Sequence, residues 1–322
     1  MSDILTIEKT AAWLKERDNF LVLTHRRPDG DTLGSGGALA QCLRELGKTA
    51  YVLCNPEATP RYFHCIEPYI APDSFVPEYI ISVDTATVDL FPPNAAEYLS
   101  RVSLSIDHHP SNTFYAEQTC LNAEHASCGE VVFDIITNMT DHISPETAER
   151  LYIALSTDTG CFSFNNTTAN TLSVASRLIE AGAPNKELNK VLFRTKTQSR
   201  IKIESMMLSG LEFSFDDKVA IASITRDMLT TSGANEDDLD DIASIPCSIE
   251  GVSIGIIIRE LSSADRCKLS VRTNVPYSAR QICEHFGGGG HDAAAGCIIN
   301  KPIPEVKELL NELIKNNIME LK

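Results

Sequence analysis

Short apolar runs recur along the first half of the chain, at intervals long enough to hold a helix between them. They occupy residues 20–24, 50–53, 79–83 and 102–106. Their length and their β-branched and aromatic content are typical of buried strands. Parallel strands need long crossover connections, and this spacing provides them. The pattern therefore predicts an α/β domain with a mostly parallel sheet and helices on both faces.

Helical periodicity fills most of the intervening segments. The expected helices span residues 7–15, 32–46, 130–139, 146–156 and 171–180. Small residues at 34–38 would let the second of these helices approach the sheet closely. At 186–208 the pattern stays helical but is rich in Lys, Arg and Gln. We therefore place a connector at 186–208, between domains at 1–185 and 209–322.

The second domain is expected to be a smaller α/β domain, separated from the first by a cleft. Its strands are predicted at 211–215, 219–224, 252–258 and 268–271. An acidic stretch at 236–241 lies between them. Because carboxylates favour helix N-termini, this stretch is interpreted as a solvated helix start.

Composition restricts the partners of the chain. With 322 residues and a formal net charge of -16, it lacks the excess of basic residues on which binding to long duplex nucleic acid depends. No apolar stretch approaches the roughly 20 residues of a membrane helix, and Met1-Ser2-Asp3 does not begin the basic and then apolar pattern of a secretory leader. We therefore expect a cytoplasmic protein that binds no membrane. The ten cysteines form no C-x-x-C pair, so most are expected to be buried hydrophobes.

Polar residues at the ends of the predicted elements carry the chemistry. Carboxyl ends of parallel strands share one edge of a sheet, so these side chains should converge there. The converging residues are His25, Asp29, Asp31, Asp84, His108 and Asp158. Four carboxylates in one crevice repel one another and must be neutralised. Two divalent cations would do so, and mixed nitrogen and oxygen ligation favours manganese, with iron or cobalt as substitutes.

Each of these residues also has an ordinary structural explanation. His25 alone is explained by a simple hydrogen bond at a strand end, and 29–31 by a turn. Asp84 and Asp158 are both compatible with helix caps. Caps recurring by chance beside histidines in one domain are a poorer explanation than a shared site.

The second domain contains groups suited to binding phosphate. Its glycine-rich segment, 286–291, includes Gly288, Gly289, Gly290 and His291. Glycines let backbone N–H groups approach a phosphate, although a hinge or tight turn is an equally simple interpretation. Ser270 and Arg272 share one face of a predicted strand with Lys268, and Arg272 could clamp a phosphate. For Arg259, a surface salt bridge is as good an explanation as substrate binding.

Four segments of the first domain resemble the motifs of the DHH phosphoesterase family. They are Thr24-His25-Arg26-Arg27-Pro28-Asp29-Gly30-Asp31, Val83-Asp84-Thr85, Asp107-His108-His109 and Thr157-Asp158-Thr159-Gly160. The segment 286–291 is similar to the glycine-rich signature of the DHH-associated C-terminal domain. Together these resemblances cover essentially the whole chain.

The resemblance implies two Mn²⁺ ions, with Co²⁺, Fe²⁺ or Mg²⁺ as substitutes. One ion would be held by His25, Asp29 and Asp84, and the other by Asp31, Asp84, His108 and Asp158. Asp84 would then bridge the ions, and a water between them would attack phosphorus in line. His109 would face the substrate, and Asp107 would orient a histidine.

Within this family, the two-domain chain is similar to hydrolases of short oligoribonucleotides that also remove the 3'-phosphate from adenosine 3',5'-bisphosphate. The expected partners are thus short RNA oligonucleotides or small phosphorylated nucleotides, and a homodimer is compatible with the resemblance. Hydrolysis of a cyclic dinucleotide or its linear product is the alternative. A pyrophosphatase or a non-catalytic nucleotide-binding regulator ranks lower.

Overall fold

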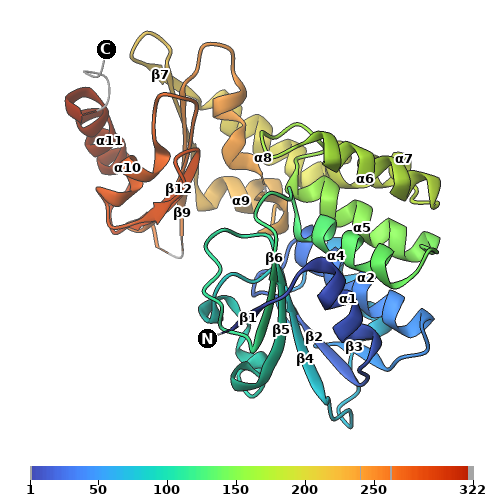
Figure 1. Cartoon of the computed structure of the whole chain (residues 1–322). Coiled ribbons are helices and arrows are strands. Elements are labelled where there is room, and N and C mark those ends of the chain that lie inside the picture. The colour runs from blue at the N-terminus through green and yellow to red at the C-terminus, as the bar shows by residue number, and fades with distance from the viewer. Residues whose placement is uncertain (1, 240, 262, 318–322) are drawn as a thin grey trace. The chain divides into compact units, whose positions relative to one another are not determined.

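The chain folds into two compact units, Met1–Thr195 and Lys196–Lys322, each containing a six-stranded sheet. The computed structural model describes residues 2–239, 241–261 and 263–317 (Figure 1). Across these described ranges, no helix combines the length and the apolar character needed to cross a bilayer.

The N-terminal unit is built on a parallel sheet with the strand order β1-β6-β5-β4-β2-β3. Every neighbouring pair of strands is parallel. The strands are β1 (Asp3–Ile4), β2 (Phe20–Leu23), β3 (Ala50–Val52), β4 (Tyr79–Val83), β5 (Val102–Asp107) and β6 (Gln118–Leu121). The predicted α/β class and parallel sheet are confirmed.

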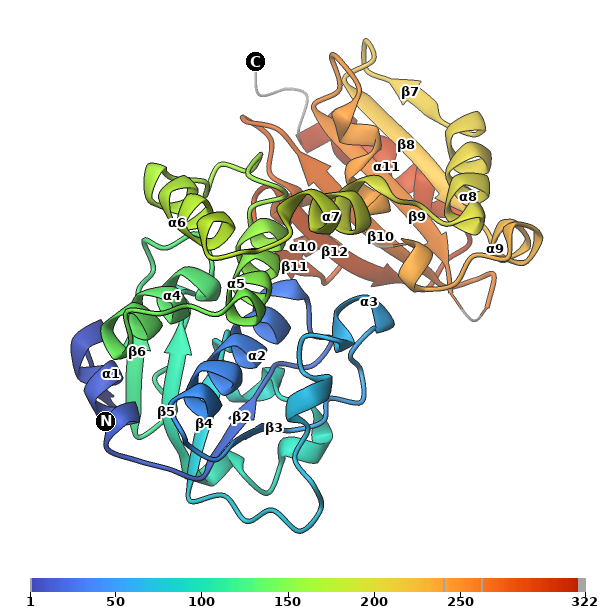
Figure 2. The same cartoon turned by 90° about the vertical axis from the view of Figure 1, so that its right-hand side faces the viewer.

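Long helices cover one face of this sheet, and short 3-10 helices cover the other (Figures 1 and 2). The helices of the unit are α1 (Ile7–Lys15), α2 (Gly30–Glu45), α3 (Pro60–Phe63), α4 (Cys128–Met139), α5 (Pro145–Asp158), α6 (Ala169–Glu180) and α7 (Asn185–Asn189). Along β2, Phe20 and Val22 pack into the helical layer. Leu21 and Leu23 face Phe91 and the 3-10 helices Pro93–Ala95 and Leu99–Arg101 instead. Alternation along the strands thus supplies both apolar faces.

Glycines allow helix α2 to lie close to its neighbours, although only one of them faces the sheet. A Cβ atom on Gly36 would meet Val83 and Thr24 side-chain atoms at 3.4 Å, an ordinary contact. On Gly34 it would lie 2.5 Å from the Arg150 carbonyl oxygen in α5, and on Gly37 it would lie 2.2 Å from the Cys65 carbonyl oxygen. The expected close approach to the sheet therefore holds for Gly36, whereas Gly34 and Gly37 admit α5 and the Cys65 backbone.

The C-terminal unit has a mixed sheet with the strand order β11-β12-β10-β9-β8-β7. Its strands are β7 (Glu212–Ser214), β8 (Val219–Ile224), β9 (Ile254–Glu260), β10 (Cys267–Thr273), β11 (Gly289–Gly290) and β12 (Ala294–Ile299). Only β8 and β9 pair in parallel among them. Helices α10 (Ala279–Glu284) and α11 (Ile303–Asn317) pack on one face, and α8 (Gln198–Ser209) packs on the other with the adjoining α9 (Arg226–Ser232) (Figure 1).

The segment 186–208 and the acidic stretch 236–241 differ from the sequence expectations. The helical pattern of 186–208 is broken by a π-helix, Lys190–Arg194, and by the turn that precedes α8. The acidic stretch contains a 3-10 helix, Asp237–Leu239, and residue 240 lies outside the described residues. Asp238 is buried and accepts a hydrogen bond of 2.5 Å from Thr197 Oγ1, so this carboxylate is part of the packing and is not solvated.

We expect Gly37→Ala to destabilise the N-terminal unit and Gly36→Ala to leave it unchanged or slightly more stable. Both substitutions gain about 1 kcal/mol of helix propensity. At position 37 the added methyl group meets a backbone carbonyl, and such overpacking costs about 1–3 kcal/mol or more. Urea unfolding of the two variants measures the difference, and equal stabilities would contradict the packing argument.

Candidate metal centre

The candidate site lies at the carboxyl edge of the N-terminal sheet, where strand order reverses. From β2 the chain moves outward to β3 and then returns to β4 on the other side of β2. His25 follows β2, Asp84 follows β4, and His108 follows β5. Ligand sites of open parallel sheets occur at such reversals, because the loops diverge there.

Three aspartates reach the same place from helices. Asp29 caps α2 and accepts hydrogen bonds from the amides of Asp31 and Thr32. Asp31 lies in the first turn of α2, and Asp158 is the last residue of α5. Asp29 therefore serves both as the cap that its sequence context allows and as a member of the cluster, whereas Asp84 precedes no helix that it could cap.

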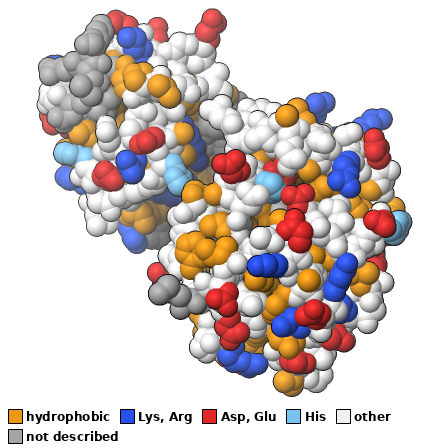
Figure 3. Space-filling model, viewed as in Figure 1, with side chains coloured by type: hydrophobic (Ala, Val, Ile, Leu, Met, Phe, Trp, Pro, Cys, Tyr) orange, Lys and Arg blue, Asp and Glu red, His pale blue; other side chains and the backbone are white. Residues whose placement is uncertain are grey.

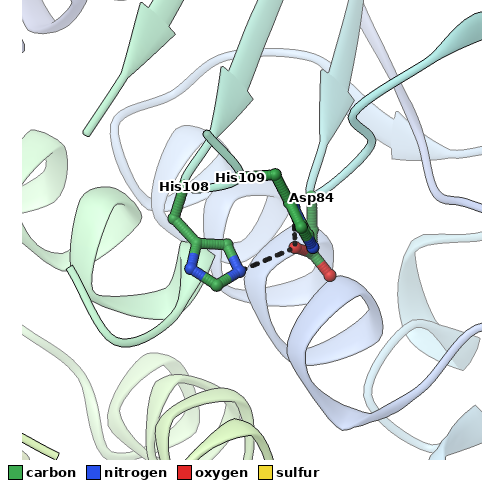
Figure 4. Close-up of side chains that lie close together, drawn as sticks. All are labelled: Asp84, His108 and His109. Carbon is green, nitrogen blue, oxygen red and sulfur yellow. Dashed lines mark ion pairs between the residues drawn. The ribbon is translucent and has the colours of Figure 1, made fainter. Parts of the chain in front are cut away.

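Asp84 occupies the centre of the cluster. Its Oδ2 atom lies 3.5 Å from His25 Nε2, and its Oδ1 atom lies 3.5 Å from His108 Nε2 and 3.5 Å from His109 Nδ1. Figure 4 shows both histidine rings directed at this carboxylate. Asp84 is buried, its Oδ1 atom has no hydrogen-bond partner, and its backbone adopts a left-handed φ of 54°. Strained backbone and an unpartnered buried oxygen are both costly, and both are common at functional sites.

The remaining members fall on the two sides of Asp84. On one side, His25 Nε2 lies 3.7 Å from Asp29 Oδ1. On the other side, His108 Nε2 lies 3.7 Å from Asp31 Oδ2 and 3.8 Å from Asp158 Oδ2. Each of the sets His25/Asp29/Asp84, Asp31/His108/Asp158 and Asp84/His108/His109 offers ligand atoms within 4.8 Å of one another.

These separations suit metal ions better than direct hydrogen bonds. Distances of 3.5–3.8 Å exceed the usual range for a nitrogen–oxygen hydrogen bond. Donor atoms that share a cation at about 2.1 Å lie about 3.0–3.5 Å apart, so modest adjustment would let each set hold one ion. The mixture of imidazole nitrogen and carboxylate oxygen suits manganese, iron or cobalt.

The electrostatics of the cluster also call for positive charge. Burial and repulsion by Asp84 and Asp158 raise the pKa of Asp31 well above its usual value. Burial, with the nearby Asp84, raises the pKa of Asp158 to about 6. Burial lowers the pKa of the two histidines, but attraction to the surrounding aspartates outweighs it and raises the pKa of His25 to about 11 and that of His108 to about 10. The residues present therefore fit a pair of bound divalent cations.

Asp107 organises the loop that carries both histidines. It is fully buried, and its Oδ1 atom accepts hydrogen bonds from the amides of His108 and His109 and from His109 Nδ1, the last at 2.8 Å. Asn112 Nδ2 donates to its Oδ2 atom at 2.6 Å. The hydrogen bond that His109 donates to Asp107 raises the pKa of His109. Asp107 thus orients His109 from outside the metal cluster.

The candidate phosphate-binding residues of the C-terminal unit lie on neighbouring strands. Ser270 in β10 is paired with Gly296 in β12, which is paired in turn with Gly289 in β11. Arg272 lies two residues from Ser270 on the same face, partly exposed. Gly296 and Gly289 therefore leave the part of the sheet next to Ser270 without side chains.

In the segment 286–291, a left-handed backbone accounts for Gly287 and close packing accounts for Gly288 and Gly290, whereas neither accounts for Gly289. Gly287 has a φ of 74° after α10, and a Cβ atom on Gly288 would lie 2.3 Å from Cys297 Cβ. On Gly290 it would lie 2.6 Å from the Ala294 carbonyl oxygen, whereas on Gly289 it would meet nothing within 4 Å. The predicted segment is therefore partly a helix end and an edge strand, with Gly289 facing open space.

His291 and Arg259 differ in their surroundings. His291 is exposed, and its amide donates to the Ala294 carbonyl oxygen. Arg259 Nη1 lies 2.6 Å from Glu236 Oε2. Arg259 therefore forms a surface salt bridge, which was one of its two explanations from the sequence.

Several supporting residues were not found by sequence reasoning. Asn55 donates to the His25 carbonyl oxygen, and Asn166 donates to that of Asp158. The amides of Cys128 and Gly129 donate to Asp31. Backbone donors have no sequence signal, whereas Asn55, just after a predicted strand, could have been suspected.

On the face viewed in Figure 3, Lys and Arg side chains are dispersed among Asp and Glu.

Family models match both units of the chain. The model described as the DHH family, N-terminal domain, matches residues 19–155. The model described as the DHHA1 domain matches residues 216–320. The first match includes five of the six cluster residues, and the second includes the glycine-rich segment.

Individual proteins resemble the chain over most of its length. A protein of Thermus thermophilus, named bifunctional oligoribonuclease and PAP phosphatase NrnA, is 29% identical over 86% of this chain and 83% of its own. The crystal structure of an exopolyphosphatase-related protein from Bacteroides fragilis matches with a TM-score of 0.86 at 23% identity, over 96% of this chain and 95% of that chain. The structure of RecJ in complex with Mn²⁺ from Thermus thermophilus matches with a TM-score of 0.56 at 14% identity, over 98% of this chain and 55% of that chain.

We expect Asp107→Ala to lower the free energy of unfolding by at least about 3 kcal/mol, because it leaves several buried or partly buried donors without a partner at about 1–3 kcal/mol each. Asp89→Ala removes an exposed carboxylate from the 3-10 helix Val88–Leu90 and should change stability by less than about 0.5 kcal/mol. Urea unfolding in the presence of a chelator measures both effects. A loss no larger than that of the control would refute the organising role of Asp107.

Proposed function

Because this chain belongs to the DHH family of phosphoesterases and carries a DHHA1 domain, we propose that it is a manganese-dependent hydrolase of short oligoribonucleotides. We also propose that it removes the 3'-phosphate from adenosine 3',5'-bisphosphate. The observation that carries the proposal is the position of Asp84, whose two carboxylate oxygens face the two sides of the metal centre. The name of the Thermus relative supports the substrate class.

Residues of the N-terminal unit would hold the metal ions. His25, Asp29 and Asp84 would hold one, and Asp31, Asp84, His108 and Asp158 would hold the other. When bound, such ions supply Lewis acidity and activate water for attack on phosphorus. Asp84 would position both ions relative to each other, because its left-handed backbone aims the carboxylate between His25 and His108.

His109 would act on the substrate. Its Nδ1 atom hydrogen bonds to Asp107, so its Nε2 atom is the ring nitrogen available to a phosphate or leaving oxygen. Its side chain is 42% exposed, which permits such contact. Because Asp107 raises its pKa, His109 can hold a proton on Nε2 and donate it to that oxygen.

The C-terminal unit would bind the remainder of the substrate. Arg272, Ser270 and the amides of Gly288–Gly290 would contact phosphate oxygens, with His291 at the end of the glycine segment. We assign no phosphate contact to Arg259, because its guanidinium group already pairs with Glu236. In this assignment, residues 1–185 are catalytic, 186–208 connect, and 209–322 recognise substrate.

A hydrolysis assay in Mn²⁺ tests the proposed function. The substrates are a trinucleotide RNA, adenosine 3',5'-bisphosphate, cyclic and linear dinucleotides, and pyrophosphate. We expect turnover of the trinucleotide and the bisphosphate, and a loss of at least about a thousandfold in Asp84→Asn, equivalent to about 4 kcal/mol. Asn is the appropriate replacement because it tolerates the left-handed φ of 54°.

Other outcomes of that assay distinguish the alternatives. Preferential turnover of cyclic or linear dinucleotides would favour the dinucleotide phosphodiesterase. Nucleotide binding without any turnover would indicate a regulator. Near-normal activity of Asp84→Asn would refute the assignment of Asp84 to both ions.

Gly289→Ala should weaken substrate binding without destabilising the fold. The added methyl group meets no protein atom but would stand where a phosphate approaches the backbone, so KM should rise about tenfold, or about 1.4 kcal/mol. Gly288→Ala is the contrasting variant, because its methyl group meets Cys297 and should lower Tm. Unchanged KM in Gly289→Ala would place the phosphate elsewhere.

A further inference from the structure

The loop that follows β6, taken together with the first two residues of α4 (residues 122–129), supports three of the cluster residues. It contacts Asp31 through two amides, His108 through a carbonyl group, and Asp158 through the side chain of Asn166. These three residues form one of the three possible ligand sets of the site. The loop therefore supports the side of the metal centre that contains Asp31, His108 and Asp158.

The contact with Asp31 fixes both oxygens of that carboxylate. The Cys128 amide donates to Oδ2 at 2.7 Å, and the Gly129 amide donates to Oδ1 at 2.9 Å. Ser35 Oγ donates to Oδ1 at 3.0 Å. Asp31 is 1% exposed, so its orientation depends on these donors.

The contact with His108 selects which ring nitrogen faces the aspartates. His108 Nδ1 lies 3.3 Å from the His125 carbonyl oxygen, which can only accept a hydrogen bond. Nδ1 must therefore carry the proton, and Nε2 is left to act as a ligand. The His125 side chain holds this part of the loop, because its Nε2 atom lies 2.7 Å from Asp134 Oδ2 in α4.

The contact with Asp158 runs through one exposed side chain. Asn166 Nδ2 donates to the Ala126 carbonyl oxygen at 3.1 Å and to that of Asp158 at 3.0 Å. It thereby joins the loop to the end of α5. The neighbouring Asn165 is exposed as well and makes no hydrogen bond recorded for the described side chains, which makes it a matched comparison.

The other side of the metal centre has its own supports. His25 Nδ1 lies 2.8 Å from the Arg26 carbonyl oxygen, and Asn55 Nδ2 donates to the His25 carbonyl oxygen at 2.8 Å. Asp29 is held as the cap of α2. The two sides are thus oriented by different parts of the chain.

We propose that the loop at residues 122–129 is a positioning element that sets the affinity of the metal position formed by Asp31, His108 and Asp158, independently of the position formed by His25 and Asp29. Asn166 and the His125–Asp134 pair are positioning residues in this arrangement. The inference rests on the proposed function, in which the chain binds two metal ions. Partners that orient metal ligands typically change metal affinity by about 10–100-fold.

Titration of the full-length apo chain with Mn²⁺ by isothermal titration calorimetry tests this inference without reference to hydrolysis. Asp29→Asn and Asp158→Asn provide reference isotherms for loss of either position. We expect Asn166→Ala to weaken, by about 10–100-fold, the same binding step that Asp158→Asn removes. The step that Asp29→Asn removes should stay within about twofold, and Asn165→Ala should match the wild type.

A second pair of variants separates positioning from general stability. Asp134→Ala should weaken the same step as Asn166→Ala, whereas Asp134→Asn should restore it because the amide oxygen can still accept from His125 Nε2. The Tm of each variant in chelator should equal that of the wild type within a few degrees.

The results have distinct meanings for this inference and for the proposed function. Equal weakening of both steps, an unchanged isotherm in Asn166→Ala, or the same loss in Asn165→Ala would overturn the inference. A wild-type chain that binds a single Mn²⁺ ion would overturn the two-metal centre itself, and with it this inference. If the wild-type chain binds Mn²⁺ in two steps but hydrolyses no nucleotide, the proposed activity is refuted. The variants then still decide the inference, because their readout is metal binding.

Discussion

Mutual repulsion among four clustered carboxylates, of which Asp31 and Asp84 are buried, is the constraint on which the N-terminal unit depends. Asp29, Asp31, Asp84 and Asp158 converge at one edge of a parallel sheet, together with His25, His108 and His109. The raised pKa values of Asp31 and Asp158 express the cost of keeping these groups charged there. A fold that retains such a cluster must bind compensating charge, so the chemistry of the site and its electrostatic cost have the same origin.

The surrounding backbone is arranged to tolerate that cost. Asp84 takes a left-handed conformation between β4 and the following loop, and Asp31 accepts two amides at the start of α4. The N-terminus of a helix favours negative charge, so it offsets part of the repulsion at Asp31. Glycines at 34 and 37 let α2 lie against α5 and the Cys65 backbone, which brings Asp31 and Asp158 to the same point. Helix packing therefore contributes to the site as directly as the ligand side chains do.

Much of the fold could be predicted from the sequence, because apolar runs and helix caps are local signals. The helix Ile7–Lys15 and the strands Tyr79–Val83 and Val219–Ile224 have the bounds that the pattern predicts. Strands β1, β6, β11 and β12 were missed. β1 and β11 have two residues each, and β11 consists of glycines, so neither has a hydrophobic period to detect. The buried Asp238 was misjudged because its partner, Thr197, is distant in sequence.

The cluster of candidate metal ligands could be predicted from the sequence, whereas the groups that orient these ligands could not. His25, Asp84 and His108 follow strands and had to converge once the sheet was parallel, whereas Asp158 reaches the site through the packing of α5. The hydrogen bonds that orient them come from backbone groups and from Asn55, His125 and Asn166, whose sequence contexts resemble those of ordinary loop residues. Asn55 supports the side of the centre that contains His25, and Asn166 supports the side that contains Asp158. In the proposed two-metal centre, the groups that orient the ligands would therefore contribute to metal affinity separately on each side.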